Sequence, residues 1–126
     1  MIKKILIICT GLALGLGAGC GDKVTEPETP PPVAAADLPT QIQAAFSSAD
    51  TQLKGMADQA VKAFQAGNWP LSLGTFNKML TRTDLTEEQY TLASRCIMTV
   101  NAKLQAAQAN GDQRAQKFLQ QQEISK

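Results

Sequence analysis

The chain has 126 residues, of which 44% are hydrophobic and 18% charged, and its formal net charge is +1. This length suits one small domain, and the balanced charge argues against nucleic-acid binding. The sequence contains no His, so the commonest general base and the commonest metal ligand are both absent. We therefore expect no metal site and no cofactor.

The first nineteen residues have the pattern of a secretory signal peptide. Lys3 and Lys4 give a positive start, and an apolar run rich in small residues follows over 5–19. The run is shorter than the roughly 20 apolar residues that a membrane-spanning helix needs, and four glycines interrupt it. We expect residues 1–19 to act as an export signal.

The end of this segment, Gly17-Ala18-Gly19-Cys20, resembles the lipobox of bacterial lipoproteins. In that family a Leu-Ala-Gly-Cys type sequence is cut before the Cys, whose thiol receives a diacylglycerol. Ala18, Gly19 and Cys20 match, whereas Gly17 stands where Leu is usual. The resemblance implies that Cys20 becomes the lipidated first residue of a protein in the bacterial cell envelope. Ordinary cleavage, with Cys20 lost or left as a free thiol, is the alternative.

The resemblance also bears on location. Two or more acyl chains anchor a protein stably, whereas one chain does not. In this family an Asp directly after the Cys implies retention in the inner membrane. Gly21 occupies that position here, which implies the outer membrane, with the domain in the periplasm.

Residues 20–39 differ sharply in composition from the rest of the chain. They contain five of the six prolines, and residues 21–39 carry four acidic residues and one Lys. Proline fixes φ and lacks an N–H donor, which disfavours helices and central strands. We expect a flexible, Pro-rich tether over 20–39 and a helical domain over 40–126. A spacer role is favoured over recognition by a proline-binding module.

The domain region predicts helices separated by tight turns. Apolar residues recur at steps of three and four from Ile42 to Phe64, which predicts one helix that ends before Gly67. Pro70 suits the first turn of a second helix, which should end near Arg82. A third should begin at Thr86, where Gln89 completes a capping box.

The third predicted helix is the longest. A hydrophobic staple of Leu85 with Tyr90 is expected at its start, and its buried face should run from Tyr90 to Ala107. Asn110-Gly111-Asp112 then ends this helix and begins a short C-terminal one. The prediction is an all-α fold: a small antiparallel bundle of three main helices plus a short fourth.

No pattern in the chain predicts an enzyme. Glu87 and Glu88 form an adjacent acidic pair, but neighbours on a helix point in directions about 100° apart, so they are interpreted as charges that stabilise a helix start. Cys96 lies among apolar residues, where a buried Cys acts as an inert hydrophobe. Residues 40–126 carry nine basic and seven acidic residues, too few and too dispersed for nucleic-acid binding.

Residues 60–69 (AVKAFQAGNW), followed by Ser72, Phe76 and Leu80, resemble the middle of a tetratricopeptide repeat. Met79 is larger than the usual Ala, Asp84 replaces the closing Pro, and Pro70 is atypical. Gly111-Asp112 follows Gly67-Asn68 by 44 residues, whereas the repeat length is roughly 34. The resemblance implies a single helical hairpin with similar packing.

These features predict a non-enzymatic envelope lipoprotein whose helical domain binds a protein partner. Trp69 is the candidate partner-binding residue, since Trp is enriched at binding centres, although packing in the core or turn is the more frequent role. The alternative is a self-associating structural spacer that uses the heptad-like faces of the first and third helices. An enzyme or a small-ligand carrier ranks last.

Overall fold

The structure, a computed structural model, describes residues 29–126. The predicted signal peptide and Cys20 lie outside the described residues. The described part folds into five helices, which are α1 (Leu38–Ala45), α2 (Thr51–Gln65), α3 (Trp69–Leu80), α4 (Glu87–Ala109) and α5 (Gln113–Ile124). Within residues 29–126 there is no strand, and the predicted all-α fold is confirmed.

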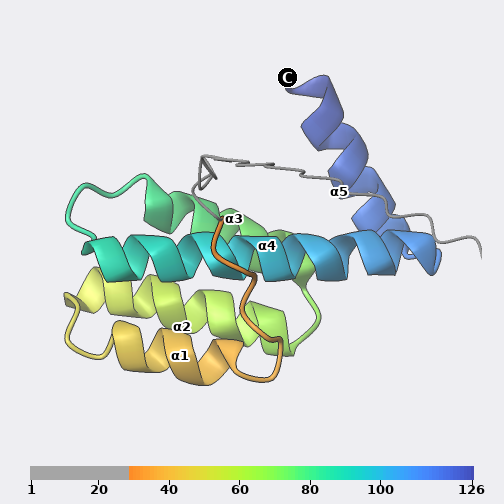
Figure 1. Ribbon diagram of the computed structural model, residues 1–126. Coiled ribbons are helices and arrows are strands. Elements are labelled where there is room, and N and C mark those ends of the chain that lie inside the picture. The colour runs from red at the N-terminus through yellow and green to blue at the C-terminus, as the bar shows by residue number, and fades with distance from the viewer. Residues whose placement is uncertain (1–28) are drawn as a thin grey trace, which may run out of the picture.

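Helix α3 packs against both α2 and α4, and these three helices form the body of the domain (Figure 1). Helix α1 covers one side of this body and contacts both α2 and α4. Helix α5 points away from the bundle at the far end of α4, where only Ala115 among its residues is buried. The core is therefore built by the first four helices.

The predicted first helix is in fact two helices, α1 and α2, separated at residues 46–50. Ser47 Oγ donates to the Ala44 carbonyl (2.9 Å), and the Asp50 carboxylate accepts from the backbone N–H groups of Gln52 (2.9 Å) and Leu53 (3.0 Å). These short polar side chains satisfy backbone groups and so end one helix and begin the next. The apolar spacing continues across the break because both helices face the same core.

The packed part of the chain begins before residue 40, where the helical domain was expected to start. Val33 and Leu38 are buried, at 2% and 0% exposure. Pro39 lies in the first turn of α1, where the missing N–H breaks no helical hydrogen bond. Part of the proline-rich region, from Val33 onward, therefore packs against the domain, which its composition does not indicate.

Two corners of the fold have the same local structure. Gly67 ends the α2 side of the first corner at φ 72°, and Gly111 ends the α4 side of the second at φ 85°, a region that glycine enters without steric cost. The following Asn68 and Asp112 each cap the next helix. Both predicted helix ends are confirmed.

Ser72 makes the contact that holds α2 and α3 close together. It is fully buried, and its Oγ donates to the Ala60 carbonyl (3.0 Å). The small side chain lets the two helix backbones approach each other. The hairpin implied by the tetratricopeptide resemblance is thus present, while kinship with that family stays a prediction.

The start of α4 is as predicted, and its buried face is as predicted at Ala93, Val100 and Leu104 but not at its first residue. Thr86 Oγ1 accepts from the Gln89 N–H, and Gln89 Oε1 accepts from the Thr86 N–H, both at 3.1 Å, which confirms the capping box. Tyr90 is 51% exposed, so its predicted place on the buried face is wrong. Gln89 turns inward instead, and its Nε2 donates to the Ala45 carbonyl of α1 (3.0 Å).

Candidate partner-binding groove

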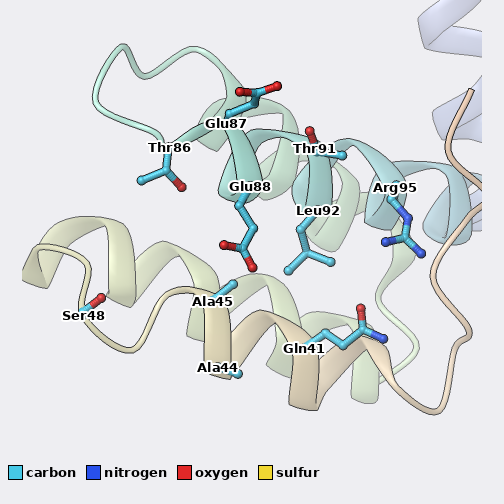
Figure 2. A pocket seen from close by; sticks show the side chains of 10 residues that line it. All are labelled: Gln41, Ala44, Ala45, Ser48, Thr86, Glu87, Glu88, Thr91, Leu92 and Arg95. Atoms are coloured by element: carbon cyan, nitrogen blue, oxygen red, sulfur yellow. The ribbon is translucent and has the colours of Figure 1, made fainter. Parts of the chain in front are cut away.

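An open groove of about 1070 Å³ lies between α1 and the first half of α4 (Figure 2). Its lining comes from both helices and the segments beside them: Gln41, Ala44, Ala45, Ser48, Thr86, Glu87, Glu88, Thr91, Leu92 and Arg95. The apolar part is formed by Ala44, Ala45 and Leu92. Ala45 is the residue that α1 directs toward α4 here, and its short side chain leaves the space beside Leu92 unfilled.

Opposite charges stand at the two ends of this groove. Figure 2 shows the Glu88 carboxylate directed toward α1 beside Ala45, and the Arg95 guanidinium directed toward Gln41. The Glu87 carboxylate points away from α1, so the adjacent glutamates diverge as the helix geometry predicts. Among residues 29–126, neither Glu88 nor Arg95 forms a salt bridge.

The Arg95 end of the groove is fixed by the proline-rich segment. Arg95 Nε donates to the Pro31 carbonyl (2.7 Å), and one turn further along α4 Thr99 Oγ1 donates to the Val33 carbonyl (2.5 Å). The first bond orients the guanidinium, while its two terminal nitrogens make no hydrogen bond within the described residues. The bond from Nε therefore holds the Arg95 side chain in place, and the N–H groups of its two terminal nitrogens can bind a ligand.

Trp69, the residue predicted to bind a partner, lies at the α2–α3 corner and outside the groove. Its ring is half-buried and packs edge-on against Phe64, with ring centroids 5.3 Å apart and planes at 66°. It also covers the space beside Gly67. Trp69 therefore packs the corner between α2 and α3. The hollow beside Trp69 holds about 20 Å³, which is too small for a side chain of a partner.

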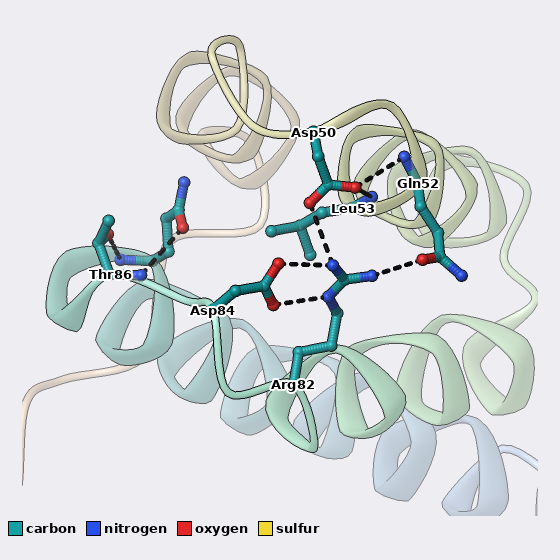
Figure 3. Close-up of polar contacts among 7 residues, drawn as sticks. Asp50, Gln52, Leu53, Arg82, Asp84 and Thr86 are labelled. Atoms are coloured by element: carbon teal, nitrogen blue, oxygen red, sulfur yellow. Dashed lines mark hydrogen bonds and ion pairs between the residues drawn. The ribbon is translucent and has the colours of Figure 1, made fainter.

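The only ion pairs within residues 29–126 centre on Arg82, just after α3 (Figure 3). Arg82 donates from Nε to Asp84 (2.8 Å), from Nη1 to Gln52 (2.8 Å) and from Nη2 to Asp50 (3.1 Å). Hydrogen bonding from Arg82 lowers the pKa of Asp84 to about 2. Asp50 also caps α2, so the cluster ties the start of α2 to the end of α3. The donors of Arg82 are bound to the acceptors of its neighbours within the cluster. We therefore interpret the cluster as a contact that stabilises the fold.

Cys96 is fully buried in the core, as predicted for an inert side chain. Burial raises the pKa of its thiol to about 12, and the charge of the neighbouring Arg95 opposes this only in part. A thiol with so high a pKa is a poor nucleophile at neutral pH.

The part of the chain that the structure describes contains no cluster of three potential metal-ligating side chains. None of the helices between residues 29 and 126 is both long enough and apolar enough to cross a bilayer.

The sequence did not reveal the groove. Alanines at 44 and 45 and charges at 88 and 95 are ordinary features of exposed helix faces. They form a site only because α1 crosses α4 at this point. The sequence does contain one indication of the site: Glu88 and Arg95 are seven residues apart, so they lie on the same face of a helix.

Comparisons with protein-family models, with curated proteins and with solved structures give no match for this chain. The class that residues 29–126 define is a small all-α domain with an open, charged groove between α1 and α4.

Proposed function

We propose that this protein is a non-enzymatic lipoprotein of the bacterial envelope, anchored through Cys20, whose helical domain binds a protein partner on the periplasmic side. The observation that carries the binding role is the groove between α1 and α4, into which Glu88 and Arg95 are directed without an ionic partner among residues 29–126. Lipid anchoring is supported by the lipobox-like residues 17–20. The outer membrane is the proposed location because Gly21 follows the Cys.

The surface proposed for binding is the groove and no longer the Trp69 corner. Binding sites for helices and peptides are concave, mostly apolar at the centre and polar at the rim. The groove has this composition, with Ala44, Ala45 and Leu92 between polar neighbours. Trp69 contributes to stability by packing on Phe64.

The rival proposal, a self-associating spacer, rested on the heptad-like faces of the predicted first and third helices. In the structure these faces are buried against each other and against α3: Ile42, Leu53 and Ala60 from the first predicted helix, Cys96, Val100 and Leu104 from the third. Tyr90 is the exception on α4, at 51% exposure, so little of either face is left to pack against a second chain. Self-association is therefore the less favoured proposal. Sedimentation of the purified chain at several concentrations would reveal it.

Anchoring is tested by mass spectrometry of the protein purified from membranes. The expected amino terminus is Cys20 carrying a diacylglycerol, and a Cys20→Ser variant should leave the membrane fraction. An intact Met1, or an unmodified thiol at the processed terminus, would contradict the proposal.

The binding role is tested by photocrosslinking in intact cells. A photoreactive amino acid at position 44 should give a discrete adduct with another envelope protein, and the same probe at position 71, outside the groove, is the matched control. If adducts appear at neither position, nor at other exposed positions of α1 to α5, the partner-binding function is wrong.

A further inference from the structure

We propose that the groove between α1 and α4 binds one helix of the partner, and that this helix carries an acidic and a basic side chain two turns apart with small apolar residues between them. This inference rests on the proposed partner-binding function and names the chemistry of the partner.

The charge pattern follows from Glu88 and Arg95. These residues are seven positions apart on α4, which corresponds to about 10 Å along the helix axis at 1.5 Å per residue. Both side chains are directed into the groove and neither has an ionic partner among residues 29–126. An occupant with a cation near Glu88 and an anion near Arg95, at the same spacing, pairs both charges at once. On a helix this spacing is again i, i+7.

The Arg95 end selects an acid more strongly than the Glu88 end selects a base. Arg95 is half-buried and is held by its bond to the Pro31 carbonyl (2.7 Å), so less side-chain freedom is lost when it binds a carboxylate. Glu88 is exposed. Such exposed pairs add little affinity but decide which partner fits and in which register.

The apolar part of the groove favours a helix as the occupant. The residues 29–126 offer no sheet edge to which an extended peptide could add. Ala45 lies between α1 and α4 and has a short side chain, so a third helix can approach closely and set its own small residues against it and Leu92.

The direction of the bound helix follows from its own dipole. Acidic residues stabilise the first turn of a helix and basic residues stabilise the last. A partner helix with its acid first and its base seven residues later therefore places its N-terminus at Arg95 and its C-terminus at Glu88. It runs antiparallel to α4 and parallel to α1, whose own Gln41 lies at the Arg95 end (Figure 2).

The test uses two fluorescent alanine-based peptides of about fifteen residues, a length at which such helices begin to form. One peptide has Glu in its first turn and Lys seven residues later, and the other has Glu at both positions. Binding to the full chain in detergent micelles is followed by fluorescence anisotropy. We expect the Glu–Lys peptide to bind about fivefold more tightly than the Glu–Glu peptide.

Charge reversal at one end of the groove should reverse this preference. In Glu88→Lys both ends are cationic, so the Glu–Glu peptide should become the tighter ligand by about fivefold. Glu123→Lys makes the same charge change on α5, outside the groove, and should keep the wild-type preference. Ala44→Gln, which adds a longer side chain at an exposed lining position of the groove, should weaken both peptides.

Three results would each overturn the inference: no saturable binding of either peptide, the same preference in wild type and Glu88→Lys, or unchanged binding in Ala44→Gln. Circular dichroism of each variant checks that the fold is kept. If the photocrosslinking experiment gives partner adducts at other faces while the peptides fail, the partner-binding function stands and only the groove assignment is wrong.

Discussion

Thr99 Oγ1 donates a hydrogen bond to the carbonyl of Val33, 66 residues earlier in the chain, over 2.5 Å. Both residues are buried, at 6% and 2% exposure. The bond satisfies a backbone acceptor that water cannot reach, and with the bond from Arg95 to Pro31 it fixes the proline-rich segment on α4. The position where this segment joins the domain is therefore set by α4.

Thr99→Val should lower the free energy of unfolding by about 1–3 kcal/mol, because it leaves the buried Val33 carbonyl without a donor. Thr99→Ser keeps the hydroxyl and should cost clearly less. Urea unfolding followed by circular dichroism measures both. No loss of stability in Thr99→Val, which keeps the Thr methyl group and removes only the hydroxyl, would mean that the hydrogen bond contributes nothing.

Leu38→Ala should destabilise the domain by about 2–5 kcal/mol, the range for large-to-small changes in a packed core. Leu38 is fully buried although the sequence places it inside a proline-rich tether. The neighbouring Thr40 is exposed, and Thr40→Ala should change stability by no more than about 0.5 kcal/mol. A Leu38→Ala domain as stable as Thr40→Ala would show that the domain does begin after residue 39.

What the sequence predicts correctly in this fold is local. The Thr86–Gln89 capping box and the helix ends at Gly67 and Gly111 depend on residues a few positions apart, and the structure has them as expected. The misplaced features depend on contacts between distant segments. Leu38 is buried by helices that follow it in the chain, and Tyr90 is exposed because α4 packs on α1 through Gln89.

The break between α1 and α2 was missed for a different reason. Its signal is local, since Asp50 is a good N-cap residue, but the apolar spacing runs through it without interruption. The groove could not be predicted because it is a property of how α1 crosses α4. The side chains that form it, such as Ala44 and Arg95, carry no pattern of their own.

Gly55→Ala and Gly74→Ala should each stabilise the protein by about 0.5–1 kcal/mol, since glycine in a helix interior is less favourable than alanine by that amount. A methyl group at either position would meet no atom within 4 Å, so no clash offsets the gain. Gly67→Ala is the matched contrast. Its φ of 72° strains an alanine, and a loss of about 1 kcal/mol is expected. Thermal unfolding of the three variants checks the signs, and destabilisation by both helical changes would contradict the open space around them.

Asp84 should make the stability of the protein depend on pH in the acid range. Its hydrogen bond with Arg82 lowers its pKa from 3.8 to about 2 in the folded state, so the unfolded state binds the proton more readily. The stabilisation is complete above the unfolded pKa and is lost as the pH falls from about 4 through 2. Asp84→Asn should therefore flatten the stability curve in this window, as measured by urea unfolding at several pH values. Glu123→Gln, which removes an exposed charge that has no ion pair among residues 29–126, should leave the slope unchanged.

Cys96 should react with Ellman's reagent only when the protein opens. Its thiol is fully buried and its pKa is raised from 9.0 to about 12, which at pH 8 leaves about a thousandfold less thiolate than an exposed thiol has. A chain with Cys9→Ser and Cys20→Ser reports this thiol alone. Labelling at pH 8 should be slower in buffer than in denaturing urea by at least that factor. Destabilising changes such as Leu38→Ala should speed it by the factor by which they raise the fraction of opened molecules, about tenfold for each 1.4 kcal/mol lost. Fast labelling in buffer would mean that α4 separates from α3 far more readily than their packing implies.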